Sequence, residues 1–199
     1  MDTKITTFIF DCFGVVCSPV LNGWYKENRL KHGLVDGNIL KVFQKFDLGQ
    51  FSEDDIINYF LSYEGVNSTK EKIREDVDSY LHIDNQLVDT IKNLKNKGFK
   101  IVLLSNGNAS FFERKLYIMF PEFKSLFDEI IISSNIGMVK PNDDIYFYAL
   151  SKINSKPEES VFIDDNKMNI DAAENLGIKS FLYTDANSFN NYLENLDII

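Results

Sequence analysis

The 199-residue sequence contains only two cysteines and four prolines. The short spacing of Cys12 and Cys17 suits neither a disulfide framework nor a four-ligand metal site, so we expect both to be small buried packing residues. The chain has no internal repeat, no low-complexity tract and no proline-rich linker. These absences argue against a division into tandem domains.

Excess positive charge and long hydrophobic runs are also absent. The formal charge is −9, and no block of lysine and arginine offsets it locally, so a nucleic-acid backbone would repel the chain. The apolar start, residues 5–16, is too short to span a bilayer, is interrupted by Asp11, and lacks the basic flank and cleavage site of a signal peptide. We therefore expect a cytoplasmic protein that binds neither nucleic acid nor membrane.

What the sequence does contain is an alternation of strand-like and helix-like segments. The near-continuous apolar run at 5–10 is typical of a strand buried on both faces of a parallel sheet. We expect strands at 5–10, 99–104, 129–133, 160–164 and 180–183, and helices at 85–97, 109–119, 142–153 and 168–176. Strands alternating with helices predict an α/β fold, with a parallel sheet covered on both faces.

A long helical interval separates the first two predicted strands. Within it, Ser52-Glu53-Asp54-Asp55 resembles a capping box ahead of apolar residues at helical spacing. We expect residues 1–16 and 86–199 to form the α/β core, and residues 17–85 to form an inserted helical subdomain.

Polar residues close several of the predicted strands. Asp11 ends the first strand, Ser105 follows the second, and Asp164 ends the fourth. In a parallel α/β sheet the ligand site lies beyond the carboxyl ends of the strands, so these side chains should gather at one edge. An acid that ends a buried apolar run is costly unless it is paired or bound to a metal, which favours a functional role for Asp11.

The acidic residues suit a magnesium-assisted reaction at phosphorus. A carboxylate that approaches a phosphate dianion meets like-charge repulsion, so a metal ion has to neutralise the pair. Magnesium prefers hard oxygen ligands, which Asp11, Asp164 and Asp165 can supply. Taken alone, Asp164-Asp165-Asn166 is equally typical of a turn and helix N-cap.

The remaining polar segments carry groups that can bind a phosphate. Lys140 can offer an ammonium to the transferring group, Ser105 can offer a hydroxyl, and the backbone amides of Asn106 and Gly107 can form an anion cradle. Taken alone, the Ser105–Gly107 segment is an ordinary loop and Lys140-Pro141 carries little information.

As a set, in this order, the segments around Asp11, Ser105, Lys140 and Asp164 resemble the motifs of the haloacid dehalogenase superfamily of hydrolases. The resemblance spans essentially the whole chain and implies a Rossmann-like core with a helical cap of the C1 type. It implies that Asp11 attacks phosphorus and becomes an aspartyl-phosphate. It also implies that magnesium is held by Asp11, the backbone carbonyl of Phe13, Asp164 and Asp165.

The Asp-Asp-Asn segment and the Gly-Met-Val-Lys-Pro segment at 137–141 are similar to those of a glucose-1-phosphate phosphatase-like subgroup. Most phosphatases of the superfamily carry a second aspartate where this chain has Phe13, and that aspartate protonates the leaving oxygen. General acid-base assistance is worth about 10² to 10⁴ in rate.

Three interpretations follow from Phe13. The first is a magnesium-dependent phosphatase of small phosphorylated metabolites, such as sugar phosphates, whose acid is a metal-bound water or a cap residue. The second is a 2-haloacid dehalogenase-like hydrolase, because those enzymes carry an aromatic residue there. The third is a protein that binds a phosphorylated ligand without turning it over. His32 and His82 are candidate cap acids, although surface or structural roles are the expectation for both.

Overall fold

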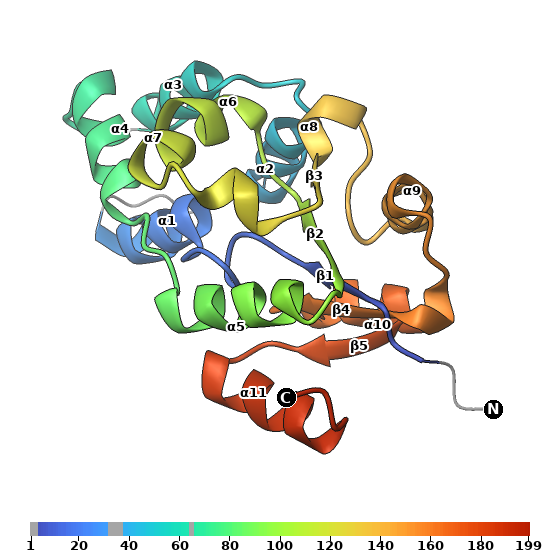
Figure 1. The fold of residues 1–199 in the computed structure, drawn as a ribbon. Helices are drawn as coiled ribbons and strands as arrows, with labels where there is room; N and C mark the ends of the chain where they lie inside the picture. Colours follow the sequence, from blue (N-terminus) through green and yellow to red (C-terminus); the bar gives the residue numbers. More distant parts are fainter. Residues whose placement is uncertain (1–3, 32–37, 64–65) are drawn as a thin grey trace.

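A computed structural model describes residues 4–31, 38–63 and 66–199 (Figure 1). The described residues form a five-stranded, all-parallel sheet in the order β3-β2-β1-β4-β5. Its strands are β1 (Thr7–Phe10), β2 (Lys100–Ser105), β3 (Glu129–Ile132), β4 (Ser160–Asp164) and β5 (Lys179–Leu182). The predicted α/β class is therefore confirmed, and each predicted strand is present to within two residues.

The helices that flank the sheet are α5 (Asn85–Asn96), α8 (Ser133–Ile136), α9 (Asp143–Ile153), α10 (Lys167–Asn175) and α11 (Ala186–Asn195). Short 3₁₀ turns occur at Phe123–Leu126 and Pro157–Glu159. The helix expected at 109–119 is divided into α6 (Ala109–Phe111), a π-helical turn at Phe112–Leu116, and α7 (Tyr117–Met119). Helices α8 and α11 and the 3₁₀ turns were not expected from the sequence.

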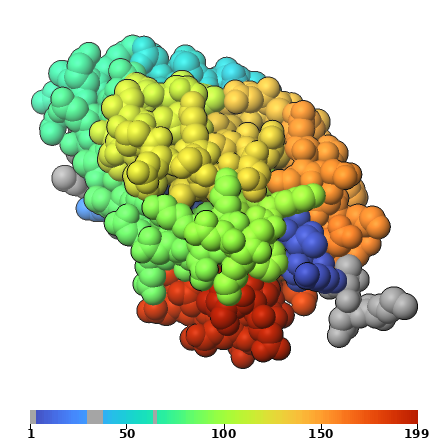
Figure 2. All heavy atoms as spheres, in the orientation of Figure 1, coloured from blue at the N-terminus to red at the C-terminus, as the bar shows by residue number. Residues whose placement is uncertain are grey.

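Strand residues point alternately to the two faces of the sheet, and each face is covered by its own helices. Phe8 and Phe10 pack against Phe189 of α11, with ring centroids 6.4 and 5.7 Å away, in a cluster that also includes the apolar face of α5. Ile9 lies in a second cluster with the buried faces of α9 and α10. In the space-filling view, α5 in green, α11 in red and the yellow segment around residues 110–130 form much of the visible surface (Figure 2).

The described residues between β1 and α5 form four helices, in line with the helical pattern expected there. They are α1 (Val20–Lys31), α2 (Ile39–Asp47), α3 (Glu53–Leu61) and α4 (Lys70–Ser79). The predicted capping box at Ser52 and Asp55 is present and begins α3. Trp24 packs on Phe60, with ring centroids 4.8 Å apart, in the small apolar centre of these helices. The division into a core and a cap at residues 16/17 and 85/86 stays a prediction.

Cys12 and Cys17 are free and buried, with their sulfur atoms 3.8 Å apart, in agreement with the packing role expected for them. Within the described ranges no helix is both long enough and apolar enough to cross a bilayer.

Candidate active site

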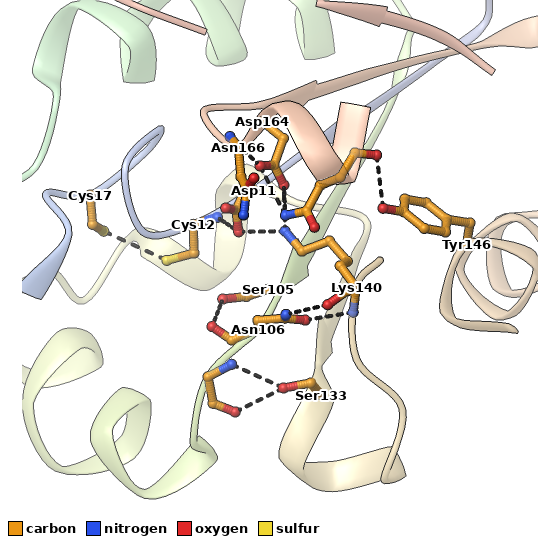
Figure 3. A network of polar contacts seen from close by, with 12 residues as sticks. Asp11, Cys12, Cys17, Ser105, Asn106, Ser133, Lys140, Tyr146, Asp164 and Asn166 are labelled. Atoms are coloured by element: carbon orange, nitrogen blue, oxygen red, sulfur yellow. Dashed lines mark hydrogen bonds and ion pairs between the residues drawn. The ribbon is translucent and has the colours of Figure 1, made fainter. Parts of the chain in front are cut away.

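Three polar residues meet at the carboxyl edge of the sheet, as their positions at strand ends predict. Strand β1 pairs with β4 on one side and with β2 on the other, and Phe10 is in register with both Leu103 and Ile163. Asp11 is the next residue after Phe10, so it emerges between Ser105 and Asp164, which close the two neighbouring strands. Figure 3 shows Asp11, Asp164 and Lys140 turned toward one another.

Lys140 joins the two acids, although it comes from the loop between α8 and α9. Its Nζ lies 2.8 Å from Asp11 Oδ1 and 2.7 Å from Asp164 Oδ2, and its side chain is fully buried. Burial disfavours the ammonium, but the two carboxylates more than offset this effect, so the pKa of Lys140 is raised and the side chain stays protonated. The side-chain amide of Asn106 pairs with both the N–H and the carbonyl of Lys140, at 2.9 Å each, and so orients the lysine backbone.

The acids of this edge form a compact cluster. Asp11, Asp164 and Asp165 each offer one carboxylate oxygen, and these oxygens all lie within 4.8 Å of one another. Burial raises the pKa of Asp11 above its usual range, and the Lys140 ammonium opposes that shift. Three carboxylates facing one ammonium leave a deficit of positive charge, and two ligands of one magnesium ion stand up to about 4.2 Å apart at Mg–O distances of about 2.1 Å. These oxygens therefore fit a divalent cation after a small shift.

Two asparagines hold Asp164 in place, and a glycine leaves room for Asp165. Asn169 Nδ2 donates to both carboxylate oxygens of Asp164, at 3.1 and 3.0 Å, and the N–H of Asn166 donates to Asp164 Oδ1 at 2.8 Å. Gly14 has φ +102°, and a Cβ there would fall 2.3 Å from Asp165 Oδ2. The backbone after Asp11 therefore approaches the Asp165 carboxylate more closely than any side chain allows.

Two of the expected phosphate-binding residues, Ser105 and Asn106, lie beside Lys140 (Figure 3), and Gly107 lines the same cavity. The Ser105 hydroxyl is buried and lies 3.3 Å from the carbonyl of Asn106. The N–H of Gly107 donates to Ser133 Oγ at 3.0 Å, so this amide would have to exchange that bond in order to bind a phosphate. A Cβ on Gly107 would fall 3.0 Å from the ring of Phe13, which accounts for glycine at this position.

Phe13 is half-buried and turned toward other aromatic rings. Its ring centroid lies 5.8 Å from that of Phe111 and 5.5 Å from that of Phe112, both in edge-on geometry. The side chain therefore contributes to an apolar wall beside Asp11 and has no proton to give. This wall and helices α1–α4 enclose a cavity of about 470 Å³ that reaches down to Asp11 and Lys140.

Several residues that shape the site were not expected from the sequence. Ser133 ends the strand expected at 129–133, so the criterion that identified Asp11 and Asp164 also applies to it. Asn169 and Asn108 carry no such signal, because asparagine near the start of a helix is common. Of the two histidines considered, His82 is exposed and does not line the cavity. His32 lies outside the described residues.

Comparison with known proteins agrees with this geometry. The family model of haloacid dehalogenase-like hydrolases matches residues 5–177. A sesquiterpene phosphatase of Aspergillus oryzae is 27% identical over 94% of this chain and 93% of its own length, and a D-ribitol-5-phosphate phosphatase of Bacteroides thetaiotaomicron is 25% identical over 89% and 91%. Bifunctional epoxide hydrolase 2 of Rattus norvegicus is 32% identical over 53% of this chain. The matched segment covers only 20% of the length of that protein.

Solved structures show the same fold. A predicted hydrolase of the haloacid dehalogenase type from Porphyromonas gingivalis superposes with a TM-score of 0.76, at 25% identity, over 97% of this chain and 98% of its own. An enzyme of the same family from Bacteroides thetaiotaomicron, in complex with magnesium and inorganic phosphate, superposes with a TM-score of 0.70, at 21% identity, over 92% and 96%. The resemblance expected from the motifs is confirmed: the chain belongs to the haloacid dehalogenase-like hydrolase family.

Proposed function

We propose that this protein is a magnesium-dependent phosphatase that hydrolyses small phosphorylated metabolites, sugar phosphates among them, through an aspartyl-phosphate on Asp11. The observation that carries the proposal is the cluster of Asp11, Asp164 and Asp165 oxygens within 4.8 Å, with Lys140 in contact with two of these acids. The similarity to a sesquiterpene phosphatase and to a D-ribitol-5-phosphate phosphatase supports the same reaction.

Each residue has a task in this mechanism. Asp11 supplies the nucleophilic oxygen, and its position at the end of a buried strand holds that oxygen at the base of the cavity. Three groups bind the non-bridging oxygens of the phosphate: the Lys140 ammonium, the Ser105 hydroxyl and the backbone N–H of Asn106. They stabilise the charge spread over these oxygens in the transition state. Asn169, through Asp164, keeps one acid of the cluster fixed while the phosphoryl group moves.

Magnesium fits the cluster because the donors are hard carboxylate oxygens and the local charge is negative. Asp11, Asp164, Asp165 and the carbonyl of Phe13 would hold it. The ion supplies charge neutralisation, which lets the Asp11 carboxylate approach a phosphate dianion. A cavity of about 470 Å³ lies in the range of small-molecule sites, so the substrate is a small ester rather than a polymer.

The test is release of inorganic phosphate from a panel of sugar phosphates, alkyl phosphates and 4-nitrophenyl phosphate, with magnesium and with EDTA. We expect magnesium-dependent release that is abolished in Asp11→Asn, while Asp89→Asn, an exposed acid on α5, keeps full activity. No release from any ester would overturn the proposal.

The same preparation separates the two other interpretations. Chloride release from 2-chloropropionate in EDTA would establish dehalogenation. A stable beryllofluoride adduct without turnover of any ester would establish a binding protein. The cluster of three acids argues against metal-free dehalogenation. Burial raises the pKa of Asp11, and the neighbouring Asp164 and Asp165 raise it further against the opposing Lys140 ammonium.

A further inference from the structure

The proposed reaction lacks one group that hydrolysis of an unactivated ester requires. An alcohol leaves phosphorus readily only when its oxygen receives a proton, and Phe13 has none to give. If the protein is a phosphatase, an acidic side chain elsewhere in the cavity can supply that proton and later withdraw one from water.

Five carboxyl groups among the described residues line the cavity and are candidates for this proton donor. They belong to Asp11, Asp47, Glu53, Asp78 and Asp165. Asp11 and Asp165 are part of the acidic cluster. Glu53 and Asp78 are both bound to the guanidinium of Arg114, at 2.6 and 2.7 Å. Asp47 is the one remaining, and within the described part of the chain no hydrogen bond or ion pair engages its carboxyl group.

Asp47 is held against the phosphate-binding loop through its backbone. It is the last residue of α2, and its carbonyl accepts a hydrogen bond from Ser133 Oγ at 2.6 Å. The same Ser133 oxygen accepts from the N–H of Gly107 at 3.0 Å. Asn108 Nδ2 donates to the carbonyls of Phe46 and Phe51, at 3.3 and 3.0 Å. The turn at 46–51 is therefore tied at both ends to the loop that follows Ser105.

The surroundings of Asp47 suit proton exchange near neutral pH. Burial raises its pKa to about 7, and the Lys140 ammonium acts in the opposite direction. A general acid works best when its pKa lies near the working pH, because both protonation states are then accessible. The other charged groups that line the cavity are those of Asp11, Lys26, Glu53, Arg74, Asp78, Arg114, Lys140, Asp165 and Lys167.

We propose that Asp47 is the general acid and base of this enzyme, in the role that Phe13 cannot fill. In the first step an Asp11 oxygen bonds to phosphorus, the bond from phosphorus to the ester oxygen breaks, and the Asp47 carboxyl gives its proton to that oxygen, which releases the alcohol. In the second step the Asp47 carboxylate takes a proton from water, the water oxygen bonds to phosphorus, and the bond to Asp11 breaks. Phosphate leaves, and both acids return to their starting states.

Asp47→Asn tests this assignment, because it keeps the shape of the side chain and removes the proton exchange. With an alkyl phosphate, kcat/KM should fall by about 10² to 10⁴. With 4-nitrophenyl phosphate the first step needs little proton donation, so the variant should release a burst of nitrophenolate equal to the enzyme present. A slow steady state should follow, because the second step has lost its base, and acid quenching should trap phosphorylated protein.

Asp76→Asn is the matched control. Among the described residues this acid of α4 is ion-paired with Lys72 alone, and it does not line the cavity. It should behave as the wild type, and the thermal midpoints of both variants show whether the fold is kept. Equal losses on both esters without a burst, or no loss on the alkyl ester, overturn the role of Asp47 while phosphatase activity stands. A wild type that is inactive on every ester overturns the proposed function and this inference with it.

Discussion

Removing the ammonium of Lys140 should destabilise the metal-free protein strongly. Its Nζ contacts two acids, Asp11 at 2.8 Å and Asp164 at 2.7 Å, and all three side chains are at most 10% exposed. Lys140→Met keeps most of the aliphatic stem and leaves two buried carboxylates without their cation. Truncating one partner of a buried ion pair costs about 3–5 kcal/mol, and we expect a loss in this range at neutral pH.

The assay is urea unfolding in EDTA, compared with unfolding in magnesium. Lys92→Met is the control, since Lys92 is exposed and lies 3.7 Å from Glu122, a surface pair worth at most about 1 kcal/mol. A ligand that binds only the folded state at 100 times its dissociation constant adds about 2.7 kcal/mol. Magnesium should therefore recover much of the stability lost in Lys140→Met, and it should stabilise this variant more than the wild type.

Two results would refute this reasoning. A loss in Lys140→Met no larger than that in Lys92→Met would show that the buried acids do not depend on the ammonium. A large loss that magnesium does not reduce would show that the acidic cluster does not hold the cation. A Lys140→Met protein that folds only when magnesium is present would agree with the expectation.

Three further predictions concern the residues around the site. Folded Asp47 has a pKa of about 7, whereas an unfolded aspartate has a pKa of about 3.9. The free energy of unfolding should therefore fall as the pH rises between these values, by at most about 1.4 kcal/mol per pH unit. Urea unfolding at several pH values should show a shallower fall in Asp47→Asn, and an identical slope would contradict the raised pKa of Asp47. Asn169→Ala removes both hydrogen bonds to Asp164 and should weaken magnesium binding about 10- to 100-fold by calorimetry, whereas an unchanged affinity would rule out a positioning role. Gly14→Ala forces a Cβ toward the Asp165 carboxylate at a positive φ, so it should lower both magnesium affinity and, by about 1 kcal/mol or more, unfolding free energy; a variant unchanged in both would contradict the close approach.

Much of this architecture follows from local sequence patterns. Continuous apolar runs and helical periodicity placed the five strands to within two residues, because burial of a strand on both faces leaves a signal that needs no knowledge of its neighbours. The same patterns missed α11, although Asp185 caps its start and Phe189 and Leu193 stand four residues apart on its buried face. With Ala186 these are the three buried residues of a ten-residue helix rich in asparagine, and their period is too weak to stand out.

Some contacts of the active site were also predictable from the sequence, and others were not. The sequence by itself determined which acids close strands, and the rule that parallel strands end at one edge was enough to bring Asp11, Ser105 and Asp164 together. Only the tertiary structure decided that Lys140 bridges two acids and that Asn169 orients one of them. It also placed the Asp47 turn on Ser133, 86 residues away along the chain. These contacts depend on how distant segments pack, and a single sequence carries no periodic signal for such packing.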